Sequence, residues 1–357
     1  MLKKSLRHTD HIGLTPKGWI AIFELKGTPS YSNNPPSFEF SGFIIATIIS
    51  IVNLHKKNWL NFNIVAFGDS LTDNGNLWKM SNGTIPPGDS YFQGRWTNGH
   101  VWVEFVESRL VAKLTDCAFG GALTEKNLNG SKSEKFLSIY SVPSVKEQVE
   151  GILPNITKFP PQTTFTFWSG SYDYMKIFEN NLTITPTDII ASIQNSVSLL
   201  SSSGARRFLF LNIPPIHRIP HYKSYNNLTR LRDLVEKHNI LLNETISNIT
   251  RSKRIQAQVF DVWGFAERVL SDPRKFGFKN TVDSCLNKQE FVNGTGLNKV
   301  TGQNVVSSSI KTCENPDEYL WWDDMHPTTK AHELLAKEII MFLKSLDGSC
   351  LYLASCG

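Results

Sequence analysis

Asn63-Ile-Val-Ala-Phe67 runs directly into Gly68-Asp-Ser-Leu-Thr-Asp-Asn-Gly-Asn76, and this stretch decides the fold. Its first part is a short apolar run with the length of a buried strand. Its second part is rich in Gly and Asn, and glycine allows a sharp turn and the close approach of a substrate. Ser70 is therefore expected at the carboxyl end of a core strand, with its hydroxyl at the mouth of a sheet.

Strand-like and helix-like segments alternate along the rest of the chain. Further apolar runs typical of strands cover 163–168, 207–211 and 257–262. Apolar residues recur at helical spacing over 100–112, 144–153, 187–201, 225–249 and 328–345. Strands that alternate with crossover helices predict an α/β fold with a parallel sheet covered on both faces. Ligand sites in such sheets gather at the carboxyl ends of the strands, where Ser70 is expected.

A second polar segment, Trp321-Trp-Asp-Asp-Met-His-Pro327, lies near the other end of the chain. A serine hydroxyl is a weak nucleophile, so it needs a base, and the base needs a partner that orients it. His326 lies just ahead of a predicted helix in which Pro327 would take the first position. Asp323 can accept from the Nδ1–H of His326, which leaves Nε2 to take the Ser70 proton.

The long loop after Ser70 contains a second Gly-Asp-Ser, at 88–90. This copy follows a Pro-Pro pair with no strand before it, so Ser90 is expected to be a loop serine. The same loop carries aromatic residues that either line an acyl or sugar pocket or anchor the loop: Trp78, Tyr91, Phe92 and Trp96.

A metal site is not expected. None of the cysteines forms a Cys-x-x-Cys pair. His217 and His221 flank proline-rich sequence, where histidines are more often loop residues than ligands. His332-Glu333 is not followed by a histidine at the spacing of a zinc protease.

The composition is that of a globular protein without a nucleic-acid surface. The apolar share is 40% and the charged share 19%, which leaves little room for a long disordered tail. A chain of 357 residues can bury a substantial core. The net charge of +5 is spread thinly, without a stripe of Lys and Arg among aromatic residues, so no nucleic-acid partner is expected.

The cysteines and glycosylation sequons favour the secretory pathway. Cys285 with Cys313, and Cys350 with Cys356, are the expected disulfides, although reduced thiols remain the alternative. Cys117 lies in an apolar run and is expected to be a small buried residue. Asn-x-Ser/Thr sequons occur at Asn82, Asn129, Asn155, Asn181, Asn227, Asn243, Asn248 and Asn293. A secreted glycoprotein is the prediction.

Residues 1–60 differ from the rest and are interpreted as an N-terminal extension. The apolar tract 43–52 is too short to cross a bilayer core, which needs about 20 residues. Its length suits a signal-peptide core, but it lies far from the N-terminus and no small-x-small cleavage site follows. Three hypotheses remain: an internal signal or membrane anchor, a start codon placed too far upstream, or a buried element.

Four blocks of the chain, in this order, resemble those of the GDSL esterases and lipases of the SGNH hydrolase superfamily. The blocks are Gly68-Asp-Ser-Leu71 with Asp73-x-x-Asn76, Gly94-Arg-Trp-Thr-Asn-Gly-His-Val-Trp-Val-Glu104, Asp116-Cys-Ala-Phe-Gly-Gly-Ala122 and Trp322-Asp-Asp-Met-His-Pro-Thr328. The resemblance implies a three-layer, flavodoxin-like α/β/α sandwich with a parallel sheet of about five strands. It assigns 61–346 to the hydrolase domain and leaves 347–357 as a cysteine-containing tail.

The resemblance also implies a role for each matched residue. Ser70 would be the nucleophile, His326 the general base and Asp323 its orienting partner. The backbone N–H groups of Ser70 and Gly121 would form two arms of an oxyanion hole, with Gly120 as the fallback. The third arm departs from the family, because Tyr172 stands in Gly170-Ser-Tyr-Asp173 where the family has Asn. Tyr172 either donates its hydroxyl or only packs.

The expected reaction is two-step hydrolysis of a carboxylic ester through an acyl-enzyme, with no metal or organic cofactor. The family acts on short acyl esters, lipids and acetylated sugars, and the absence of an apolar lid-like segment favours small acyl or acetyl esters. A monomer is expected, with a membrane tether through 43–52 as one hypothesis. The alternative is a catalytically impaired member that binds carbohydrate or lipid, which Tyr172 motivates.

Overall fold

The structure, a computed structural model, describes residues 9–12, 21–24, 63–126, 128, 141–253, 255–286 and 312–346. The chain divides into two units, Met1–Asn53 and Leu54–Gly357. The described residues of the first unit form an antiparallel pair, β1 (Thr9–Ile12) with β2 (Ala21–Glu24). The tract 43–52, the tail 347–357 and the pair Cys350 and Cys356 lie outside the described residues.

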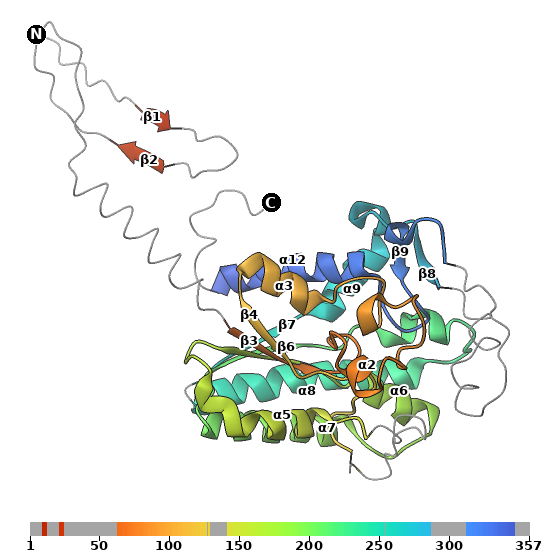
Figure 1. Ribbon diagram of the computed structural model, residues 1–357, viewed down its shortest axis with the longest axis horizontal. Coiled ribbons are helices and arrows are strands. Elements are labelled where there is room, and N and C mark those ends of the chain that lie inside the picture. The colour runs from red at the N-terminus through yellow and green to blue at the C-terminus, as the bar shows by residue number, and fades with distance from the viewer. Residues whose placement is uncertain are drawn as a thin grey trace, which may run out of the picture. The chain divides into compact units, whose positions relative to one another are not determined.

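A five-stranded parallel sheet forms the centre of the second unit (Figure 1). Its strands are β3 (Asn63–Gly68), β4 (Lys113–Asp116), β5 (Thr164–Trp168), β6 (Arg207–Leu211) and β7 (Gln256–Phe260). The spatial order is β4-β3-β5-β6-β7, and every neighbouring pair is parallel. This order is flavodoxin-like, with its switch point between β3 and β5. The predicted fold class is confirmed.

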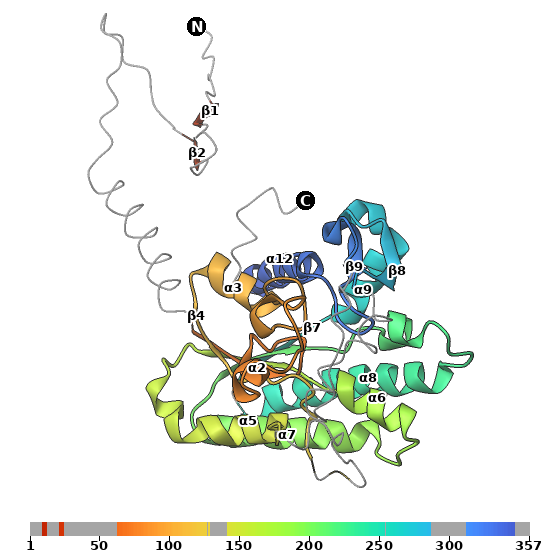
Figure 2. The same ribbon diagram turned by 45° about the vertical axis from the view of Figure 1, so that its right-hand side comes forward.

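Helices cover both faces of the sheet, as Figures 1 and 2 show from two directions. One face carries α3 (Trp102–Leu110), α9 (Val262–Ser271) and α12 (Thr329–Leu346). The other carries α5 (Val145–Ile152), α7 (Pro186–Ser202) and α8 (Thr229–Lys253). Two further helices follow strands, α2 (Asn76–Met80) and α6 (Ser171–Glu179). No helix among the described residues is long and apolar enough to cross a membrane.

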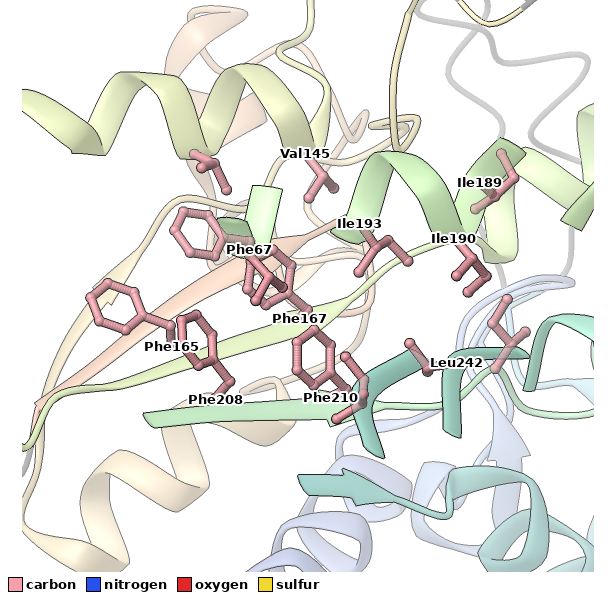
Figure 3. Close-up of a cluster of buried hydrophobic side chains, with 14 of the residues drawn as sticks. Phe67, Val145, Phe165, Phe167, Ile189, Ile190, Ile193, Phe208, Phe210 and Leu242 are labelled. Atoms are coloured by element: carbon pink, nitrogen blue, oxygen red, sulfur yellow. The ribbon is translucent and has the colours of Figure 1, made fainter. Parts of the chain in front are cut away.

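The two faces of the sheet are filled by alternate residues of the same strands. Figure 3 shows phenylalanine rings that point toward the α5, α7 and α8 side: Phe67, Phe165, Phe167, Phe208 and Phe210. The intervening residues Ile64, Ala66, Leu209 and Leu211 belong to the core on the α3, α9 and α12 side. Burial on both faces explains why β3 and β6 appear in the sequence as apolar runs without alternation.

A small second sheet and a disulfide lie next to the C-terminal polar segment. Its strands β8 (Asn280–Ser284) and β9 (Tyr319–Trp321) are parallel. Cys285 is bonded to Cys313, as predicted, while Cys117 is a free and only half-buried thiol. Short 3-10 helices complete the described fold: η1 (Phe92–Gly94), η2 (Leu153–Lys158), η3 (Ile216–Arg218), η4 (Pro220–Tyr222), η5 (Pro273–Phe276) and η6 (Pro316–Glu318).

Element boundaries differ from the sequence expectation where a side chain caps a helix. The last helix begins at Thr329, whose N–H donates to Asn98 Oδ1 (2.8 Å), and Pro327 instead forms a bridge with Trp321. Asp261 caps α9 by accepting from the N–H of Gly264, so β7 ends at Phe260. Strand β4 was not predicted, because Lys-Leu-Thr-Asp is a short and largely polar edge strand.

Candidate active site

Ser70 lies in the turn that follows β3, at the switch point of the sheet. The turn closes through hydrogen bonds from the N–H groups of Thr72 and Asp73 to the carbonyl of Asp69, both 3.0 Å. A glycine is needed at Gly68, because a Cβ there would lie 2.5 Å from the Trp168 carbonyl oxygen of β5. The side chain of Gln148 also holds this residue, since it both accepts from the Gly68 N–H and donates to its carbonyl.

The structure brings Ser70, His326 and Asp323 together. His326 Nε2 lies 2.8 Å from Ser70 Oγ, and His326 Nδ1 lies 2.8 Å from Asp323 Oδ2. Residues 256 positions apart in the sequence therefore meet at one edge of the sheet. The neighbouring Asp324 turns away and contacts His221 instead. The predicted contacts of His326 with Asp323 and Ser70 are present.

The carboxylate of Asp323 is 1% exposed and receives several hydrogen bonds. The backbone N–H groups of Met325 and His326 donate to its Oδ1 at 2.8 and 2.7 Å. The hydroxyl of Tyr91 donates to its Oδ2 at 2.7 Å. Donors of this kind stabilise a buried carboxylate in its ionised form. An ionised Asp323 accepts from Nδ1–H of His326 and leaves Nε2 as an acceptor for the Ser70 hydroxyl.

Two of the four loop aromatics contact this group. The Trp96 ring lies on the His326 ring, with 5.0 Å between their centroids, and the Tyr91 ring meets Trp96 edge-on at 5.6 Å. Trp78 instead packs beneath the backbone at Gly94, where a Cβ would clash with it. Ser90 lies in the same loop and does not line the cavity beside Ser70. The contact of Tyr91 with Asp323 was not predicted, since no local sequence pattern signals it.

The glycine block approaches Ser70 from β4. The N–H of Gly120 donates to the buried carboxylate of Asp73 at 2.7 Å. Gly121 has a positive φ of 74° and lines the same cavity as Ser70. Because the Gly120 N–H is already engaged, the geometry favours Gly121 over Gly120 as a donor toward that cavity.

Tyr172 lies in the first turn of α6 and lines the cavity. Its ring packs against the cluster of Leu77, Ile85, Ala122 and Val142, and Lys176 Nζ lies 5.2 Å from the ring centroid. The next residue, Asp173, is buried and accepts from both the N–H and the hydroxyl of Thr124. The turn is thereby fixed against the loop that follows the glycine block.

A largely apolar cavity of about 390 Å³ opens beside Ser70 and His326. Side chains of α9 and α12 contribute to its lining, among them Val262, Phe265, Val269 and Leu335. Lys176, Glu179 and His221 add polar groups. This volume falls within the range of small-molecule pockets in proteins.

Several buried titratable groups lie at or beside the site, and two of them, Asp69 and His332, line its cavity. Burial raises the pKa of Asp69 to about 6 and that of Asp173 to about 7. Burial lowers the pKa of His332 to about 3, so this histidine is neutral, and its Nδ1 accepts from the Trp102 N–H. No group of three or more metal-binding side chains occurs in the described part of the chain, and His217 and His221 join no such group there.

A family model described as GDSL-like Lipase/Acylhydrolase matches residues 64–339. The chain belongs to this family. The identification drawn from the four sequence blocks is therefore confirmed, and so, at the level of the family, is the expectation of a GDSL-type carboxylic ester hydrolase.

Individual relatives of this GDSL-family chain are distant. The thermolabile hemolysin of Vibrio parahaemolyticus is 27% identical over 286 residues, covering 78% of this chain and 62% of its own length. The phosphatidylcholine-sterol acyltransferase of Aeromonas hydrophila is 25% identical over 312 residues, covering 79% of this chain and 90% of the relative. A catalytic mutant of an acetylxylan esterase from Geobacillus stearothermophilus aligns in structure with a TM-score of 0.42 and 12% identity, over 78% of this chain and 92% of the other.

Proposed function

We propose that the protein hydrolyses carboxylic esters, with Ser70 as nucleophile, His326 as general base and Asp323 as the partner that orients His326. One observation carries the proposal: a continuous chain of short contacts runs from Asp323 through His326 to Ser70 Oγ, with 2.8 Å at each step. Such a chain provides the two things that a serine nucleophile lacks, a proton acceptor and a fixed tautomer of that acceptor.

The reaction then follows from these positions. As Ser70 Oγ attacks the ester carbonyl, its proton passes to His326 Nε2, and buried Asp323 stabilises the imidazolium that forms. His326 returns the proton to the departing alcohol oxygen, which leaves an acyl group on Ser70. A water molecule next loses a proton to His326 and attacks this acyl-enzyme. The acid departs, and Ser70 regains its proton from His326.

The oxyanion that forms in each step needs donors that are already in place. We assign the backbone N–H groups of Ser70 and Gly121 to this role, because both residues line the cavity and Gly120 is engaged by Asp73. Tyr172 stands at the third position. Its packing against the Leu77 cluster and Lys176 favours a wall over a donor.

The acyl part of the ester is assigned to the apolar cavity. The sequence favours small acyl or acetyl esters of sugars or lipids, but a cavity of about 390 Å³ has room for more than an acetyl group. We therefore extend the proposal to esters with longer acyl chains. The phosphatidylcholine-sterol acyltransferase among the relatives agrees with a lipid ester in this role.

We also propose that the protein acts in the secretory pathway. The Cys285–Cys313 disulfide agrees with an oxidising compartment. Sequons at Asn82, Asn155, Asn181, Asn227, Asn243 and Asn248 fall within the described residues. A monomer, and a tether through 43–52, are further proposals that follow from the sequence alone.

A chain-length series of nitrophenyl esters, assayed on the purified protein, tests the function. Wild type should hydrolyse the series, with kcat/KM rising from acetate toward longer acyl groups by about fourfold per added methylene until the cavity is filled. Ser70→Ala should abolish turnover, and Ser90→Ala, which removes the serine of the second Gly-Asp-Ser, should not. A wild type that binds these esters without Ser70-dependent turnover would favour the alternative of a carbohydrate- or lipid-binding protein.

A further inference from the structure

The segment 91–97 wraps around the Asp323–His326 pair. Tyr91 donates to Asp323, and the Trp96 ring covers the His326 ring. The segment closes on itself through the hydrogen bond from the Phe92 N–H to the Thr97 carbonyl (3.0 Å). Thr97 Oγ1 donates in turn to the Pro327 carbonyl at 2.8 Å, directly after His326. The segment is therefore attached at both ends, by Tyr91 to Asp323 and by Thr97 to Pro327, and this fixes the position of Tyr91 relative to Asp323.

We propose that Tyr91 is a positioning residue of the triad, which holds Asp323 in place and sets how strongly it stabilises protonated His326. The inference rests on the proposed function of the Ser70, His326 and Asp323 group. Tyr91 itself does not line the cavity, so it acts through Asp323 and not on the substrate.

The role of Tyr91 depends on its hydrogen bond to Asp323. At 2.7 Å, between a hydroxyl that is 6% exposed by residue and a carboxylate that is 1% exposed, it is a charge-assisted bond shielded from water. Burial and the neighbouring Asp323 raise the pKa of Tyr91, so its hydroxyl keeps its proton and remains a donor. A donor on Oδ2 both restrains the carboxylate and takes up part of its charge.

Removal of this donor should have two separable effects. The carboxylate loses a restraint, so His326 is held less firmly toward Ser70 and the chemical step slows. The carboxylate also keeps more of its charge for the imidazolium, so His326 is protonated at a higher pH. Packing alone would produce neither the second effect nor its direction.

Other titratable groups also face His326 from neighbouring elements. Asp69 precedes the nucleophile and has a pKa raised by burial to about 6, and its charge interacts with that of His326. His332 of α12 has a pKa lowered to about 3 and stays neutral over the working range. Both are unchanged by a substitution at Tyr91, so the difference between wild type and variant isolates the Tyr91 contribution.

The test compares Tyr91→Phe with Tyr174→Phe across the pH range. Tyr174 is a fully buried tyrosine whose hydroxyl contacts His238 Nδ1 at 2.9 Å, so its loss is a matched change outside the site. In Tyr91→Phe, kcat should fall about tenfold with little change in KM, and the acid limb of the pH profile should move up by about half a unit. Tyr174→Phe should move neither.

A double-mutant cycle and an NMR titration complete the experiment. In an Asp323→Asn background, Tyr91→Phe should have no further effect on kcat, because its effect passes through the carboxylate. The imidazole titration of His326, followed by NMR, reports the same shift without any substrate. An unshifted titration in a folded Tyr91→Phe protein overturns the role of Tyr91 and leaves the proposed function intact. A wild-type protein without Ser70-dependent ester hydrolysis would overturn the proposed function. The NMR titration of His326 would still measure the effect of the contact between Tyr91 and Asp323.

Discussion

Ser70 and His326 are held by two different kinds of structure. The nucleophile arm, residues 63–76, is a central strand with neighbours on both sides, followed by a turn that is closed by its own backbone. Within that turn, the carboxylate of Asp73 accepts from the N–H groups of Gly75, Asn76 and Leu77. Most of the contacts that shape this arm are therefore local or belong to the sheet.

The base arm, residues 319–328, is a short strand and a turn that other segments hold in place. Cys285 and Leu286 donate their N–H groups to the carbonyls of Trp321 and Trp322 at 3.0 and 2.7 Å. On other sides, the His221 N–H donates to the Asp324 carbonyl, and Thr97 donates to Pro327. The base arm therefore depends on distant segments and should be easier to loosen than the nucleophile arm.

Removal of the disulfide should have the largest effect on the base arm, because the N–H of Cys285 donates to the Trp321 carbonyl there. The variant Cys285→Ala with Cys313→Ala opens a loop with a sequence separation of 28 residues. We expect the free energy of unfolding to fall by about 3–4 kcal/mol, with a loss of kcat as the base arm loosens. Denaturant unfolding and ester hydrolysis measure the two effects.

Cys117→Ala is the matched control, because Cys117 is a free cysteine that lies beside the nucleophile arm. Its backbone N–H donates to the Ala66 carbonyl of that arm. The substitution removes a sulfur without opening a cross-link, and we expect a change of less than about 1 kcal/mol. Equal losses in the control and in the double variant would contradict the view that the base arm depends on the disulfide.

A pH-dependent effect on stability is expected in the nucleophile arm. Burial raises the pKa of Asp69 from 3.8 to about 6, so the folded protein keeps a proton that the unfolded chain loses near pH 4. The contribution to stability is therefore largest at low pH and is lost as the pH rises from about 4 to about 6. Asp69→Asn should remove this pH-dependent part of the free energy of unfolding, which amounts to at most ~3 kcal/mol. The free energies of unfolding of wild type and Asp69→Asn, measured at pH 4 and pH 7, would show the difference. An equal change with pH in both proteins would contradict it.

The sequence predicts the nucleophile arm better than the base arm, because local contacts shape the nucleophile arm and distant segments hold the base arm. A buried apolar run and its Gly-rich turn are local signals, so the strand and the place of Ser70 follow from adjacent residues. His326 and Asp323 were found from their spacing and from the family blocks. Tyr91 was not, because it meets Asp323 across 232 positions, and only tertiary packing brings them together.

Local sequence is also insufficient to predict the edge strand of the sheet and the oxyanion donors. Strand β4 is short and polar, and only its pairing with β3 makes it a strand. The choice of Gly121 over Gly120 depends on the hydrogen bond from Gly120 to Asp73, 47 positions away. Where a role depends on a distant partner, the residue type alone leaves alternatives open.

The smallest expected effect concerns Tyr172, which lines the same cavity as Ser70 and His326. If Tyr172 only packs, Tyr172→Phe should leave kcat within about twofold of wild type, because no oxyanion donor is lost. Tyr172→Asn restores the family residue and should raise kcat if the amide reaches the oxyanion. Steady-state kinetics on a nitrophenyl ester distinguish the cases. A fall in kcat of about 10²-fold in Tyr172→Phe would instead identify its hydroxyl as a third donor.

One labelling experiment tests most directly whether the base arm activates Ser70. A fluorophosphonate reacts with an activated serine, and peptide mapping then locates the modified residue. We expect a single adduct at Ser70, lost in Ser70→Ala and strongly slowed in His326→Ala, while substitution of the exposed His100 leaves labelling unchanged. An adduct at Ser90, or labelling of Ser70 that does not depend on His326, would contradict the activation of Ser70 by the base arm.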